Sequence, residues 1–433
     1  QYIDASMVGS MGAQASASIG LMETTMWLLG SICSAAAAGF YVQVSHQLGS
    51  NDPRRARNTL RQGIMSVLVV SALIGLVSLA VSPFLPVWLG GGSDITPTAS
   101  AYFAIVATAL PIFQFSIFGA GMLRSSGNMV VPSVMSVVMM SLDVVFNFFL
   151  IFPTRPVQLF GAEVTIPGMG MGVVGAAIGT VSAELVAAAI TMYILCFRSK
   201  ELSLRIDTGR FLPTWGVVKR ALHISLPMGL QQTIMCSAYV MTTIIIAPLG
   251  TFAIAANSFG VIVESLCYMP GYGIADAATT LVGQSIGAGR HELMKRFAWL
   301  SVGLGVTVMA VMGVVMYVGA PVAMAMMTPA EEVRRLGVEV LRIEAFAEPM
   351  FAAAIVSYGV FVGAAKTLVP SIMNLVSIWG VRISLAALLA PSMGLRGVWI
   401  AMCIELCFRG FIFLVKLKFW NIQTSCNHYG KDQ

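Results

Sequence analysis

Long apolar segments alternate with short polar segments along almost the whole chain. Residues 64–85, 300–322 and 358–390 are apolar over about 20 residues or more, which is the length of an α-helix that spans a bilayer. In the first half, the same pattern predicts helices over these approximate ranges: 15–48, 53–89, 97–123, 131–152 and 173–198. Asp52 and Pro53 are a typical N-cap and first-turn pair for the second of these. The pattern therefore predicts an all-α membrane protein.

The two halves of the chain repeat each other. Residues 131–138 (VPSVMSVV) match residues 369–376 (VPSIMNLV). The number of residues between these two segments also separates five pairs of glycines and prolines. The pairs are Gly12 and Gly250, Gly49 and Gly287, Pro83 and Pro321, Pro111 and Pro349, and Pro132 and Pro370. The spacing shortens after residue 153 because the first half carries an extra loop over 154–168. Internal repetition of this kind predicts twelve transmembrane helices in two six-helix lobes related by a pseudo-twofold axis along the membrane normal.

The repeat also defines the domain organisation. It predicts an N-terminal lobe over 1–200, a cytoplasmic linker over 201–218, a C-terminal lobe over 219–420 and a cytoplasmic tail over 421–433. Asp4 matches Thr242, which lies about 15 residues inside the helix that starts the second half. We therefore expect the first helix to be truncated in this chain, with Asp4 near the middle of the complete helix.

Composition and charge agree with a membrane protein. Hydrophobic residues make up 57% of the chain and charged residues only 10%, against about 25% charged in soluble domains. The net charge of +6 does not indicate nucleic-acid binding, because the basic residues lie in short loops between the predicted helices. By the positive-inside rule, these loops and both termini are expected to be cytoplasmic. The loops on this face contain Arg54, Arg55, Arg57, Arg61, Arg198, Lys200, Arg205, Arg210, Lys219, Arg220, Arg290, Lys295 and Arg296.

Ionisable groups inside membrane helices are costly to bury, and each is a candidate functional residue. The repeat isolates one set of polar residues whose counterparts are not acidic. The first half has Asp4, Asp143, Asn147 and Thr180 where the second half has Thr242, Val381, Leu385 and Met402. A rise of about 1.5 Å per residue places Asp4, Asp143 and Thr180 at a similar depth of roughly 12 to 15 Å. We hypothesise a proton- or cation-binding cluster here; the alternative is a set of polar groups that bond helices together.

Other intramembrane acids are secondary candidates. Glu348 precedes Pro349, where a kink or a gate is expected, while Glu264 and Glu23 lie in apolar helices with no polar constellation around them. The cysteines and histidines have neither metal-ligand nor catalytic spacing. We therefore expect no enzymatic activity and no cofactor. We also expect no metal, other than a possible Na⁺ at the proton- or cation-binding cluster of Asp4, Asp143, Asn147 and Thr180.

Several strings, in order, resemble the multidrug and toxic compound extrusion (MATE) family of efflux transporters. They are residues 4–12 (DASMVGSMG), 47–53 (QLGSNDP), 175–180 (GAAIGT) and 281–289 (LVGQSIGAG). The resemblance covers essentially the whole chain. It implies a secondary active antiporter of the cell (inner) membrane that works by alternating access. Such a protein exports small organic, often cationic and amphipathic, compounds in exchange for H⁺ or Na⁺.

The resemblance also implies site residues and partners. Asp4 would be the acid of helix 1 whose protonation or ion binding drives the cycle, and Asp143, Asn147 and Thr180 would complete the site. The order Asp143 then Asn147 reverses the usual Asn then Asp of this family branch. A second branch has acids where this chain has Met235 and Phe351, and Glu348 lies one turn from Phe351. The expected partners are a small organic substrate and the lipid bilayer, with no nucleic acid, and the protein is expected to be monomeric.

Two other functions fit the sequence less well. One is a flippase of the same superfamily, which would move a lipid-linked precursor. A wide cationic groove open to lipid, or more than twelve helices, would favour this function. A receptor or channel would not need buried acids or ion-coupled concentrative transport. Separate H⁺ and Na⁺ gradients distinguish these functions from an antiporter.

Overall fold

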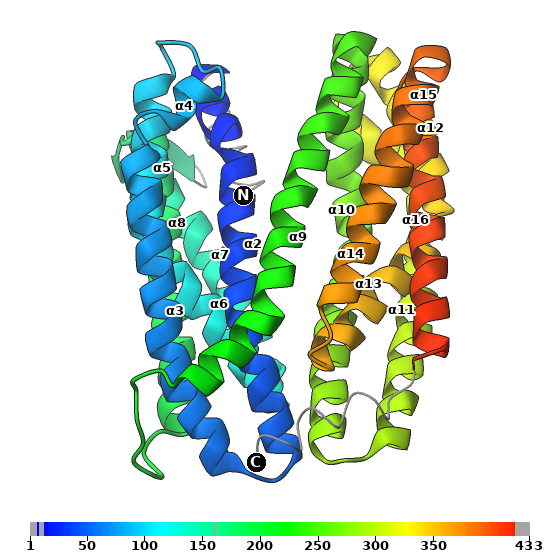
Figure 1. Cartoon of the computed structure of the whole chain (residues 1–433). Coiled ribbons are helices and arrows are strands. Elements are labelled where there is room, and N and C mark those ends of the chain that lie inside the picture. Colours follow the sequence, from blue (N-terminus) through cyan, green and yellow to red (C-terminus); the bar gives the residue numbers. More distant parts are fainter. Residues whose placement is uncertain (1–6, 8–12, 160–161, 421–433) are drawn as a thin grey trace. The chain divides into compact units, whose positions relative to one another are not determined.

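The computed structural model describes residues 7, 13–159 and 162–420 (Figure 1). Within these residues, nine helices are long and apolar enough to span a membrane, and two bent helix pairs raise the number to as many as 11. The all-α membrane fold predicted from the sequence is therefore confirmed. The predicted first helix, including Asp4, falls mostly on residues outside the described ranges.

Contacts group the chain into two compact units. We call Gln1–Val44 with Asp52–Ser225 the N-terminal unit, and Ser45–Asn51 with Leu226–Gln433 the C-terminal unit. The helices and strands up to the linker are α2 (Ala13–Gly49), α3 (Pro53–Val81), α4 (Leu85–Trp88), α5 (Thr96–Thr108), α6 (Leu110–Ser125), α7 (Val130–Ile151), β1 (Pro153–Leu159), β2 (Ala162–Met169), α8 (Gly172–Tyr193) and the π-helix η1 (Ile194–Arg198).

Local sequence signals explain where several of these elements begin and end. The Asp52 carboxylate accepts a hydrogen bond from the Arg55 amide at 3.0 Å, and Pro53 occupies the first turn of α3, as the sequence indicates. The helices α5 and α6 meet at an angle of 48° at Ala109, close to Pro111. The extra loop after α7 is an antiparallel hairpin of β1 and β2, which the sequence did not reveal.

The linker between the halves packs on the N-terminal unit. Arg57 and Arg61 form ion pairs with Asp207 at 2.7 and 2.8 Å, and Arg57 also donates to the Glu201 carbonyl at 2.9 Å. The Arg57 hydrogen bond, helped by Arg61, holds the pKa of the Asp207 carboxyl below its usual range. Residues 201–218, predicted as a separate linker, consequently group with the N-terminal unit.

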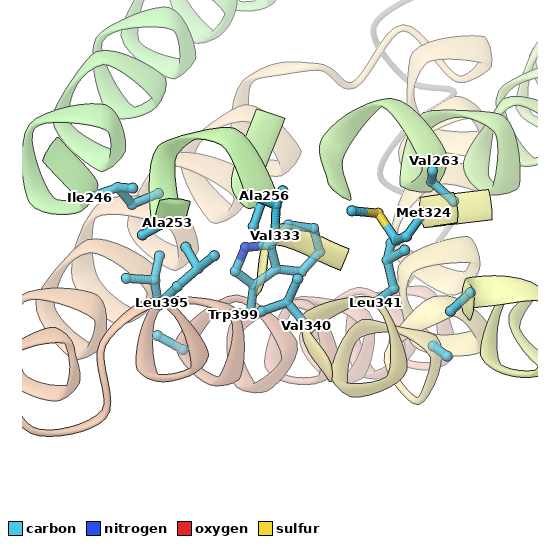
Figure 2. Packing of buried hydrophobic residues seen from close by; sticks show 14 of the residues in the cluster. Ile246, Ala253, Ala256, Val263, Met324, Val333, Val340, Leu341, Leu395 and Trp399 are labelled. Carbon is cyan, nitrogen blue, oxygen red and sulfur yellow. The ribbon is translucent and has the colours of Figure 1, made fainter. Parts of the chain in front are cut away.

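The C-terminal unit begins within α9 (Trp215–Ile246). It continues with η2 (Ala247–Leu249), α10 (Thr251–Gly287), α11 (His291–Met327), α12 (Glu331–Ala345), α13 (Glu348–Gly363), α14 (Leu368–Val376), the π-helix η3 (Ser377–Ile383), α15 (Ser384–Met393) and α16 (Leu395–Lys418). One hydrophobic core of this unit surrounds Trp399, which lies beside Ala256 and Val340 in Figure 2. The indole N–H of Trp399 donates to Asn257 Oδ1 at 3.0 Å, so its polar atom is satisfied inside the core.

Candidate functional site

Asp143 and Asn147 form a buried polar pair on α7. Their side chains are 7% and 0% exposed, and Asn147 Nδ2 donates a hydrogen bond to Asp143 Oδ1 at 3.1 Å. Residues four apart lie on one face of a helix, which is why the two side chains meet. The Asn147 amide thus turns its N–H toward the carboxylate and its oxygen away from it, and the buried carboxyl group is the one that could take up a proton or bind a hard monovalent cation.

Helix α8 packs closely against this pair. Asn147 Oδ1 lies against Gly179 so tightly that a side chain at position 179 would overlap it. Thr180 follows Gly179 on α8 and is half-buried. Helix α8 therefore approaches the pair through a glycine, while Asp4 lies outside the described residues.

The close approach at Gly179 leads to a prediction about stability. We expect Gly179→Ala to lower the free energy of unfolding by about 1–3 kcal/mol, because its methyl group would force Asn147 away from Asp143. Gly30→Ala is the matched control, since nothing lies within 4 Å of a side chain built at that position. Thermal unfolding in detergent measures both, and equal melting temperatures for the two variants would contradict this packing.

The secondary candidates occupy different environments. Glu23 is exposed on α2, whereas Glu264 on α10 is 7% exposed and Glu348 on α13 is fully buried. Glu184 on α8 is also buried and has a hydrogen bond with Ser116. Of the three secondary candidates, only Glu264 and Glu348 are buried, and both belong to the C-terminal unit.

A second polar cluster lies in the C-terminal unit, around Glu405 on α16. Its carboxylate accepts a hydrogen bond from Ser377 at 2.7 Å. It also pairs with Arg382 at 3.1 Å and with Arg409 at 3.0 Å. Ser377 and Arg382 belong to η3, and π-helical turns frequently occur at functional sites. Buried ion pairs of this kind need all their partners, because one charge left alone is costly.

Two further acids lie close to this cluster but lack its hydrogen bonds. Glu344 on α12 and Glu348 on α13 are fully buried, and none of their carboxylate oxygens has a hydrogen-bond partner among the described residues. Glu344 is within electrostatic range of Glu264, Arg382, Glu348 and Glu405. We name the set Glu264, Glu344, Glu348, Arg382, Glu405 and Arg409 the C-terminal charge cluster.

Sequence reasoning missed most of the C-terminal charge cluster. From the sequence, Glu264 and Glu348 are separate candidates, and no pattern links Glu344, Arg382 or Arg409 to them. The available signal was the presence of two bases, Arg382 and Arg409, inside otherwise apolar spans. Phe351, which stands where a related branch has an acid, instead places its ring 5.4 Å from the Arg409 guanidinium.

The clusters differ from a typical metal centre. Among residues 13–159 and 162–420, no group of three or more His, Cys, Asp or Glu side chains is placed to hold a metal ion. The two clusters instead provide buried carboxyl groups. Asp143 has the amide of Asn147 as its neighbour, and Glu344 and Glu348 have no hydrogen bonds among the described residues. Such groups change their charge by taking up or releasing a proton or a monovalent cation.

A multi-pass helical membrane protein with ionisable groups buried in its spans has the architecture of a membrane transporter. The sequence model of the MatE family matches residues 1–149 and 227–388. The chain belongs to the MatE family of transporters.

Individual relatives extend the likeness over nearly the whole chain. "Probable multidrug resistance protein NorM" of Thermotoga maritima is 25% identical over 421 residues, covering 95% of this chain and 86% of that protein. The protein of the same name from Chromobacterium violaceum is 26% identical and covers 100% of this chain and 91% of its own length.

Solved structures share the fold at lower sequence identity. A MOP superfamily transporter from Pyrococcus furiosus Vc1 superposes with a TM-score of 0.86 at 19% identity, over 96% of this chain and 90% of that chain. An outward-facing multidrug resistance MATE family transporter gives the same values. These structures support the helical fold of this chain.

Proposed function

We propose that the protein is a secondary active antiporter that exports small organic compounds, cationic and amphipathic in character, in exchange for H⁺ or Na⁺. The observation that carries this proposal is the buried Asp143–Asn147 pair on α7 of a MatE-family chain. Relatives along the whole chain are named as multidrug resistance proteins, which supports an organic substrate. The proposed location is the inner membrane, with both termini cytoplasmic.

The proposed mechanism is alternating access with ion coupling in the N-terminal unit. In the outward-open state, Asp143 takes up a proton, or binds Na⁺ together with Asn147, and Asp4 and Thr180 contribute to the same site. Uptake of the ion neutralises a buried charge and changes the relative free energies of the conformations. The state favoured by the ion binds the organic compound less tightly, and the compound is released outside.

Separate ion gradients in liposomes test this function. We expect full-length protein to accumulate a fluorescent organic cation when a H⁺ or a Na⁺ gradient is imposed, and the gradient that works identifies the ion. Protein-free liposomes correct for passive entry of the cation. Equal uptake with and without both gradients would exclude an antiporter and would instead favour a channel or a flippase.

A further inference from the structure

The linker between the two halves connects two membrane spans. One span ends at Arg198, where η1 ends, and the next begins at Trp215, the first residue of α9. In Figure 1 the linker is the loop that runs beside the start of α3. Because each span ends where the hydrocarbon core ends, both ends of the linker lie at the level of the lipid headgroups.

Hydrogen bonds fasten the linker to η1 and α3 along its length. Near its start, the Leu204 amide donates to the Cys196 carbonyl at 2.8 Å. Asp207, in its middle, forms the two ion pairs with α3 described above. At its end, the amide and the hydroxyl of Thr214 both donate to Gln62 Oε1 at 2.9 Å. The linker is therefore held in one place beside the first turns of α3.

Four large apolar side chains of this fastened segment remain exposed. The exposed fractions are 57% for Ile206, 45% for Phe211, 74% for Leu212 and 72% for Trp215. Three of these residues precede the α9 span and lie outside the hydrocarbon-spanning helices. Contiguous exposed apolar groups mark a surface for binding another molecule or a membrane. Tryptophan is also typical of the boundary between lipid and water, because its ring is apolar and its N–H is polar.

Basic residues are interspersed with these apolar side chains. Residues 198–220 contain six bases and two acids, and Asp207, one of the two acids, already pairs with bases of α3. Arg205, Arg210 and Lys219 are exposed. The Arg205 guanidinium lies 4.8 Å from the centre of the Phe197 ring, at the end of the preceding span. The exposed segment is therefore both apolar and positively charged.

The combination fits an anionic membrane surface better than a water-soluble partner. Apolar side chains with bases among them bind at the boundary of a bilayer, where the apolar groups enter the lipid and the bases meet phosphates. The two spans that flank the linker already place it beside the bilayer. An anionic phospholipid therefore matches the linker in charge, in polarity and in position.

We propose that the exposed side chains of residues 205–219 form a binding surface for anionic phospholipids, which we call the linker surface. Its four apolar side chains insert into the headgroup region, and its bases Arg205, Arg210 and Lys219 bind lipid phosphates. The contacts of Asp207 and Thr214 with α3 hold this surface against the membrane. The proposal concerns the surrounding lipid, so it stands or falls independently of antiport.

Quenching of tryptophan fluorescence by brominated lipids tests the linker surface in liposomes of the full-length protein. The emission of Trp215 is the difference between wild type and Trp215→Phe. Two equimolar mixtures of phosphatidylcholine and phosphatidylglycerol are compared, identical except for which lipid carries the bromine. We expect stronger quenching by brominated phosphatidylglycerol, because each base near an anionic lipid surface contributes roughly a fivefold factor in binding. High salt should reduce this preference by screening the charges.

Two sets of three substitutions separate the linker surface from the general charge of the protein. Changing Arg205, Arg210 and Lys219 to glutamine should make the two brominated lipids equally effective. The matched control changes three exposed bases of the C-terminal unit to glutamine and should keep the wild-type preference; they are Arg290, Lys295 and Arg296.

Two results would overturn the proposal. One is an equal effect of the two lipids in wild type, or an equal loss of the preference in both sets of variants. The other is no quenching of Trp215 by either lipid, which would show that the linker faces water and is free for a protein partner. The salt dependence is measured without the glutamine variants, so it remains a test if one of them fails to fold.

Discussion

Asp143→Asn is expected to lower gradient-driven accumulation of an organic cation by roughly 5- to 150-fold, the usual range for a coupling free energy between two ligands. The reason is that Asp143 is the only acid of the described α7, and its buried carboxyl faces Asn147. Asparagine keeps the size of the side chain but removes the group that changes charge. Uptake into liposomes under the ion gradient that drives wild type measures the loss.

The double variant Asp143→Asn with Asn147→Asp provides a rescue test. It exchanges the two side chains and keeps a hydrogen-bonded carboxyl–amide pair on the same face of α7. It also restores the Asn-then-Asp order that is usual in the related family branch. We expect a substantial part of the gradient-driven uptake to return. Full activity of Asp143→Asn alone would show that the coupling acid lies elsewhere.

Glu405→Gln is expected to have the largest effect on stability. It removes the carboxylate that Arg382 and Arg409 share, and an uncompensated buried charge costs about 3–5 kcal/mol. The midpoint of denaturant-induced unfolding in detergent should fall accordingly.

Glu339→Gln is the control for Glu405→Gln. Glu339 forms an ion pair with Arg396, whose side chain is 51% exposed, and an exposed ion pair contributes about 0–1 kcal/mol. A shift no larger for Glu405→Gln than for Glu339→Gln would mean that the C-terminal charge cluster is hydrated rather than buried.

The fold and the N-terminal pair could be predicted from the sequence because each rests on a strong local pattern. Apolar runs of membrane length define the spans, and the repeat provides an internal comparison for every position. Asp143 stands out because its counterpart is Val381. The hydrogen bond from Asn147 to Asp143 then follows from helical spacing alone.

The C-terminal charge cluster could not be predicted in the same way because its burial depends on tertiary packing. The sequence of α12, EEVRRLGVEVLRIEA, has the charge pattern of a helix with a solvated face. Glu344 is nevertheless fully buried, because the 57° bend places this end of α12 among α10, η3 and α16. Pro349 indicated a kink, but neither its angle nor its neighbours can be derived from one sequence.

The linker shows a similar limit of sequence reasoning. The sequence indicates only orientation signals at Arg57 and Arg61, because both lie in a basic loop. In the structure they bind Asp207, which is 150 and 146 residues away along the chain. A pairing over such a distance has no local signal.

Reciprocal coupling gives the most direct test of the antiport proposal. A substrate gradient imposed on liposomes without any ion gradient should drive H⁺ or Na⁺ in the opposite direction, because coupling between two ligands acts both ways. An ion-sensitive dye inside the liposomes records this flux for wild type and for Asp143→Asn. The account predicts ion movement in wild type and none in the variant. Substrate movement without any ion flux in wild type would contradict it.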